Sequence, residues 1–203
     1  RGNSMSFLLK MSRLIDAMSD LIGKLVMWFI LATTLISAGN AIVRKLFDNS
    51  SNALLEIQWY LFAAVFMLGS GYAFLRNAHV RIDFISSRFS PRGRNWVDVF
   101  GILIFLFPLC YMMATLGWPL FERAWSTGEM SSNAGGLIRW PVYGLIPLGF
   151  VVLFLQGVSE LIKRIAFLTG NGPDVLALSG PSDEELLAQQ LLDEADKRLK
   201  GAN

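Results

Sequence analysis

Residues 140–159 read WPVYGLIPLGFVVLFLQGVS, a run of twenty residues without Asp, Glu, Lys, Arg or His. Three further blocks share this property, at residues 25–43, 57–75 and 99–121. A helix needs about 20 residues to cross the ~30 Å hydrocarbon core of a bilayer, and each block meets that length. None carries the polar stripe that a helix on the surface of a soluble bundle requires. The sequence therefore predicts an all-α integral membrane protein with four transmembrane helices.

The composition of the chain agrees with this fold class. Of its 203 residues, 53% are hydrophobic and only 17% are charged, which is too apolar for a soluble domain of this size. The single cysteine, Cys110, lies in the third block, so no intrachain disulfide forms and we expect it to pack. We do not expect the first block to be a cleavable signal peptide, because it is long and is followed by Arg44 and Lys45. We expect residues 1–4 to be a vector-derived remnant ahead of a native Met5.

The distribution of basic residues predicts the orientation. Four spans place the N-terminus, the middle loop and the C-terminus on one side, and that side collects 14 of the 18 Lys and Arg residues. Positively charged loops stay in the cytoplasm, so both termini are expected there. Four tryptophans fall at the opposite ends of the spans, where indole rings favour the membrane interface: Trp59, Trp118, Trp125 and Trp140.

Segments on either side of the four-helix domain, expected at residues 24–168, carry helical patterns of their own. In residues 5–23, apolar side chains recur at helical spacing beside Lys10, Arg13 and Asp16. This pattern predicts an amphipathic helix on the inner membrane surface, the alternative being a frayed start of the first span. Residues 169–203 combine a linker containing Gly and Pro with a short charged amphipathic helix, which we expect in the cytoplasm, opened by a capping box of Ser182 and Glu185.

The sequence offers no set of catalytic or metal-binding residues. His79 falls in the cytoplasmic loop and Cys110 in a span, so the chain lacks a nucleophile with a base in reach. His79 and Asp83 are four residues apart and could supply only half of a metal site. We therefore expect no enzymatic activity, no cofactor and no nucleic-acid partner.

Acidic residues occur at the edges of the spans, where local pairs with basic residues are expected. Glu160 precedes Lys163 and Arg164 by three and four residues, and Asp98 follows Arg94 by four, spacings that bring side chains together on a helix. Such pairs anchor helix ends.

Glu56 differs from these acids because it has no basic residue three or four positions away. We expect it to pair with another helix or another chain. Four spans without charge, metal ligands or a catalytic set indicate a scaffold or accessory subunit. Such a subunit works through its contacts with a partner protein.

Several segments occur in an order that resembles a known family. They are EIQWYLF (56–62), AHVRIDF (78–84), RFSPRGR (88–94), GWPLF (117–121), GEMSSNAGG (128–136), WPVYGLIPLGF (140–150) and QGVSELIKR (156–164). On a four-span frame, this set resembles the small membrane subunit of tripartite ATP-independent periplasmic (TRAP) transporters, the DctQ-like component. The C-terminal tail from about Gly170 lies outside the resemblance.

The resemblance implies a heteromeric complex in the bacterial inner membrane. A large membrane subunit would carry the substrate and sodium sites and move as an elevator, while a soluble periplasmic receptor delivers an organic acid. The small subunit would act as a fixed scaffold in contact with membrane lipid. The alternative is a self-contained, homo-oligomeric small transporter or membrane enzyme, which the absence of intramembrane acids and histidine disfavours.

Two loops are expected to contribute to this role. The outer loop, residues 118–140, with Glu122, Glu129 and Arg139, is expected to help receive the receptor, and its Gly, Ser and Asn content predicts ordered turns. The AHVRIDF segment is expected to fix the cytoplasmic turn, with Arg81 at the lipid headgroups and Asp83 bonded to backbone or Arg; the alternative is a plain positively charged loop. The full set of partner-contacting or structural candidates is Glu56, Gln58, Trp59, His79, Arg81, Asp83, Asp98, Glu122, Glu129, Arg139, Trp140, Glu160 and Arg164.

Overall fold

The computed structural model describes residues 2–47, 51–77 and 89–175, and the regular structure of these residues is helical apart from one isolated bridge. Four helical rods in this part of the chain are long and apolar enough to cross a membrane. This confirms the predicted all-helical, four-span fold. The rods are α1 (Gly2–Phe47), α2 (Asn52–Leu75), the run of α4 (Pro91–Gly101), η1 (Ile102–Leu106) and α5 (Phe107–Thr127), and α6 (Trp140–Leu168).

The first rod differs from the expected arrangement of a separate interfacial helix followed by a span. α1 is continuous, so residues 5–23 form its first half and no break separates them from the apolar block. This half uses its polar face to bind α6, because Ser12 and Ser19 are buried against it. The position of residues 5–23 relative to a membrane surface stays a prediction.

The third rod begins and ends at residues whose chemistry suits a helix terminus. Ser90 caps α4 by accepting a hydrogen bond from the amide of Gly93, and Pro91 occupies the first turn, where its missing N–H is not needed. Gly128 ends α5 in the left-handed conformation, with φ of 61°. One buried stripe recurs at intervals of three, four, seven or eight residues along the rod: Asn95, Val99, Ile102, Cys110, Gly117 and Ala124.

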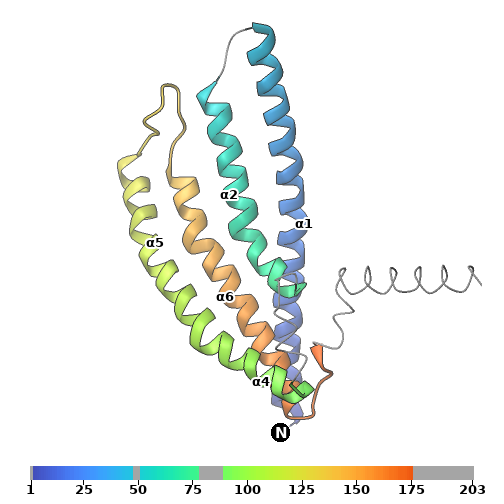
Figure 1. The fold of residues 1–203 in the computed structure, drawn as a ribbon. Coiled ribbons are helices and arrows are strands. Elements are labelled where there is room, and N and C mark those ends of the chain that lie inside the picture. Colours follow the sequence, from blue (N-terminus) through green and yellow to red (C-terminus); the bar gives the residue numbers. More distant parts are fainter. Residues whose placement is uncertain (1, 48–50, 78–88, 176–203) are drawn as a thin grey trace, which may run out of the picture.

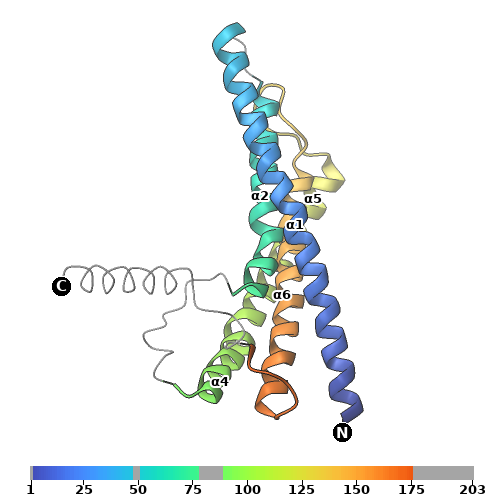
Figure 2. The same ribbon diagram turned by 90° about the vertical axis from the view of Figure 1, so that its right-hand side faces the viewer.

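α6 is the central helix of the bundle. It contacts α1, α2, α4, η1 and α5, and Figure 1 shows α5, α6, α2 and α1 side by side in that order. Figure 2 shows α1 crossing the others at an angle, so that its first half lies beside α6 and its second half beside α2. We call the end where α1 begins and α6 finishes the N-terminal end, and the end where residues 128–139 join α5 to α6 the loop end.

Close helix contacts in the bundle depend on small residues of α6. A Cβ added to Gly149 would stand 2.8 Å from the Cβ and 2.9 Å from the carbonyl oxygen of Met67 in α2. A Cβ at Gly157 would lie 2.9 Å from Leu106 and Phe107 on the third rod. Small residues let helix backbones approach closely in membranes, where dispersion contacts replace the hydrophobic effect between helices.

Two predicted features lie outside the described residues. They are the AHVRIDF turn with His79, Arg81 and Asp83, and the charged helix after the linker at the C-terminus.

Candidate functional site

A buried polar network joins α1 to α6 near the N-terminal end of the bundle. Its centre is Asp16, whose Oδ1 accepts hydrogen bonds from Ser159 Oγ at 2.6 Å and Gln156 Nε2 at 3.0 Å. Lys163 Nζ lies 3.1 Å from the other carboxylate oxygen. Three groups from α6 therefore converge on one α1 side chain.

Two serines of α1 extend this network one turn in each direction. The hydroxyls of Ser12 and Ser159 are 2.7 Å apart, and Ser19 Oγ donates to Gln156 Oε1 at 2.7 Å. All four side chains are buried. Because buried polar groups are costly unless hydrogen-bonded, these pairings fix the register of α1 against α6.

A second part of the network links α6 to α4 through charges. Glu160, whose side chain is 0% exposed, pairs with Lys163 at 2.5 Å and with Arg164, which confirms the two expected local pairs. Asp98 pairs across helices with Arg164 at 2.9 Å, not with Arg94 in its own helix as the spacing predicts. Arg164 is 1% exposed, and its planar guanidinium binds a carboxylate on each of two helices.

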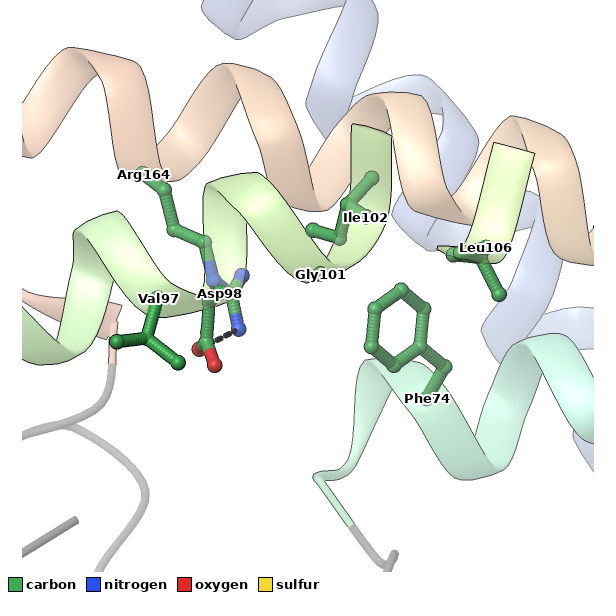
Figure 3. Close-up of a pocket in the computed structure, with 7 residues that line it drawn as sticks. All are labelled: Phe74, Val97, Asp98, Gly101, Ile102, Leu106 and Arg164. Atoms are coloured by element: carbon green, nitrogen blue, oxygen red, sulfur yellow. Dashed lines mark hydrogen bonds and ion pairs between the residues drawn. The ribbon is translucent and has the colours of Figure 1, made fainter. Parts of the chain in front are cut away.

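An open hollow of about 290 Å³ lies beside this ion pair (Figure 3). Its walls come from α2, α4, η1 and α6, namely Phe74, Val97, Asp98, Gly101, Ile102, Leu106 and Arg164. The lining is apolar except for Asp98 and Arg164, whose charges are engaged with each other. No cluster of three His, Cys, Asp or Glu side chains suited to a metal ion occurs within residues 2–47, 51–77 and 89–175.

At the loop end, Glu56 binds the connection between α5 and α6. The Glu56 side chain receives hydrogen bonds from the hydroxyl of Ser131, from Asn133 Nδ2 at 2.8 Å and from the amide of Leu137 at 2.6 Å. Glu56 is 3% exposed. The sequence predicted a partner on another helix or another chain, but the partners found are in a loop of the same chain, at residues 75 to 81 positions away.

Arg139 ends the same loop and is held by two neighbours. Its Nη1 donates to Glu129 Oε1 at 3.3 Å and to the hydroxyl of Tyr143 at 3.4 Å. Tyr143 first, and then Glu129, raise the pKa of Arg139, whose guanidinium is positively charged at neutral pH in any case. Arg139 and Glu129, two of the three residues expected to meet a receptor, therefore form one ion pair. The expected loop began too early, because α5 continues to Thr127 and Glu122 is an exposed residue of that helix.

Aromatic side chains gather beside the loop. Trp140, the first residue of α6, packs edge-on against Trp125 with ring centroids 4.7 Å apart, and Phe121 joins both. Trp59 on α2 is 66% exposed. This group occupies the level of the bundle where the sequence predicts an aromatic belt.

Two further sets of residues differ from the sequence-based expectations: Gln58, and the polar side chains in the first half of α1. Among the described residues, the Gln58 side chain donates only to the Leu54 carbonyl of its own helix, α2. The amphipathic pattern of residues 5–23 predicted a polar face but not its contact with α6, although Ser12, Asp16 and Ser19 stand four and three residues apart, which is the spacing of one helix face. Serine and glutamine carry no charge, so they do not interrupt a charge-free block and do not stand out within it.

Comparison with protein families identifies the chain. The family model described as "Tripartite ATP-independent periplasmic transporters, DctQ component" matches residues 33–167, about two thirds of the sequence. No curated protein and no solved structure matches it. The match covers α2, the third rod and the loop with its Glu56 contacts, and it confirms the resemblance seen in the ordered segments. The chain therefore belongs to the DctQ family, the small membrane component of TRAP transporters.

Proposed function

We propose that this chain is the stationary scaffold subunit of a sodium-driven, receptor-dependent importer of organic acids. It lies in the bacterial inner membrane with both termini in the cytoplasm. It pairs with a large, elevator-type membrane subunit that holds the substrate and sodium sites. The DctQ family works with a large TRAP membrane component and a periplasmic receptor, which supports this assignment.

The observation that carries the proposal is the uncovered apolar surface of the outer rods. In the most apolar stretch of α1 and of α2, 11% of residues are buried within the chain, and in the third rod 17%, against 44% in α6. Apolar side chains therefore face outward along three of the four rods. Lipid or another membrane protein must cover these side chains. A scaffold subunit needs such a surface, because it binds a partner that spans the same membrane.

The satisfied charges of the polar network support a stationary role. Asp16, Glu160, Lys163 and Arg164 each bond within the chain and tie α6 to α1 and α4. A fully connected buried network rigidifies the helices that it joins. A rigid body is what a moving neighbour needs as its fixed support.

Copurification and transport together test the proposed pairing. We expect the large membrane subunit of the same transporter to copurify with this chain in mild detergent. We also expect receptor-dependent uptake in liposomes to be lost when this chain is omitted. Clean separation of the two subunits together with uptake by the large subunit alone would refute the scaffold role. Transport by this chain alone would instead establish a self-contained transporter.

Charge reversal tests whether the loop end receives the receptor. We expect Glu122→Lys to raise, by several-fold, the receptor concentration needed for half-maximal uptake, more strongly at low salt, because exposed charges steer association. Uptake should be measured against receptor concentration at two ionic strengths.

The Glu129 position calls for a matched pair of variants, since Glu129 bonds Arg139. Glu129→Lys breaks this bond, whereas Glu129→Lys with Arg139→Glu restores it with both charges exchanged. If charge itself is recognised, both variants weaken receptor-dependent uptake. Unchanged uptake in Glu122→Lys and in the exchanged pair would refute a receptor-facing role.

A further inference from the structure

One face of α2 is devoted to holding the loop between α5 and α6. Asn52, Glu56 and Tyr60 follow one another at intervals of four, so they lie on one side of the helix. Asn52 Nδ2 donates to the carbonyl of Ala134 at 2.9 Å, and the Tyr60 hydroxyl donates to the carbonyl of Ile138 at 2.9 Å. Glu56, between them, takes the three bonds described above.

The loop is folded to fit this face. Met130 and Ile138 form an antiparallel bridge, and the Ser131 amide donates to the Leu137 carbonyl at 2.9 Å. A Cβ added to Gly136 would stand 2.9 Å from Glu56 Oε1 and 2.5 Å from the Cβ of Ser131. The loop backbone therefore approaches the carboxylate as closely as a glycine permits.

A carboxylate suits this position better than an amide. Ionised glutamate is an acceptor only, with two oxygens that can take several hydrogen bonds, and three donors from separate points of the loop meet it. A glutamine of the same shape would turn an N–H₂ group toward one of these donors. Hydrogen bonds to a charged acceptor are also stronger than neutral ones.

We infer that Glu56 is the positioning residue that holds residues 128–139 in one conformation for the receptor. This inference rests on the proposed function. The segment presents Met130 and residues 132–135 outward, all of them exposed. A surface that is already ordered loses less conformational entropy when a partner binds, so holding the loop raises affinity without Glu56 touching the receptor.

The experiment uses the complex of this chain with the large membrane subunit and the purified receptor of the same transporter. The variants are Glu56→Gln, Glu56→Ala and Gly136→Ala, of which the last disturbs the contact from the loop side without changing charge. Gln58→Ala is the matched control, because its side chain bonds only within α2. Two quantities are measured: amide hydrogen exchange in residues 128–139, and the dependence of uptake on receptor concentration.

We expect faster hydrogen exchange of the amides in residues 128–139, including that of Leu137, in Glu56→Gln, Glu56→Ala and Gly136→Ala. In Glu56→Ala the receptor concentration for half-maximal uptake should rise roughly tenfold, while uptake at saturating receptor is retained. Glu56→Gln should fall between Glu56→Ala and the unmodified complex. Gln58→Ala should leave both quantities unchanged.

Different results overturn different parts of the argument. Unchanged loop exchange in Glu56→Gln and Glu56→Ala would show that Glu56 does not hold the loop. Faster exchange with unchanged dependence on receptor would show that the held loop does not serve docking, and the scaffold role would stand. If the unmodified complex shows no receptor dependence, the proposed function fails, while the exchange data still decide whether Glu56 orders the loop.

Discussion

Arg164→Ala is expected to lower the free energy of unfolding by about 3–5 kcal/mol, the cost of removing one partner of a buried ion pair. Arg164 bridges Asp98 on α4 and Glu160 on α6. After its removal, Lys163 is the cation still within bonding distance of Glu160 among the described residues. For a chain of this length the change corresponds to a fall in Tm of roughly 6–20 °C. Thermal unfolding of the purified chain in detergent, followed by circular dichroism, measures it.

Two variants at and beside this position separate charge from geometry. Arg164→Lys keeps the charge but loses the planar fork that binds two carboxylates, so an intermediate loss is expected. Lys163→Ala removes a cation that is 16% exposed and leaves Glu160 paired with Arg164, so a smaller loss is expected. Equal stability of Arg164→Ala and the unmodified chain would show that the network does not hold α4 to α6.

Gly149→Ala is expected to destabilise the contact between α6 and α2. The new methyl group would lie 2.9 Å from the backbone oxygen of Met67, and backbone cannot move aside as a flexible side chain can. Overpacking of this kind costs about 1–3 kcal/mol. Thermal unfolding of the isolated chain gives the magnitude.

Gly39→Ala is the matched control because it makes the same chemical change in another helix. A Cβ at Gly39 in α1 would meet no atom within 4 Å, so no clash arises. Alanine is also the better helix former, by roughly 1 kcal/mol. We therefore expect unchanged or slightly higher stability for Gly39→Ala. The close-packing explanation for Gly149 fails if the two variants behave alike.

The four spans could be predicted because hydrocarbon excludes charge, and charge-free blocks are visible in the sequence. The ends of the helices were less visible. α6 continues past Ser159 through Glu160, Lys163 and Arg164, because these charges bond to one another and to neighbouring helices. A charged residue ends a charge-free block, but it does not end a helix when groups of opposite charge lie within bonding distance.

The partners of polar residues could be predicted only within one helix. The pairs of Glu160 with Lys163 and Arg164 follow from spacing, and they were found. The bond from Arg164 to Asp98 depends on α4 lying against α6, which spacing within a helix does not encode. The bonds of Glu56 to the loop depend in the same way on α2 lying beside α6.

The length of α1 has a consequence for the surrounding bilayer. Its 46 residues extend for about 69 Å, whereas a bilayer with its headgroups is about 40–45 Å thick. α1 is fastened to α2 and α6 and cannot reorient by itself, and exposed Phe7 and Leu14 make projection into water unfavourable. Only its charge-free block, residues 25–43, needs to lie in hydrocarbon, and that block extends for about 28 Å, which matches the ~30 Å core. We therefore expect the first half of α1 to meet the headgroup layer, with its apolar side chains toward lipid and its charged side chains toward water.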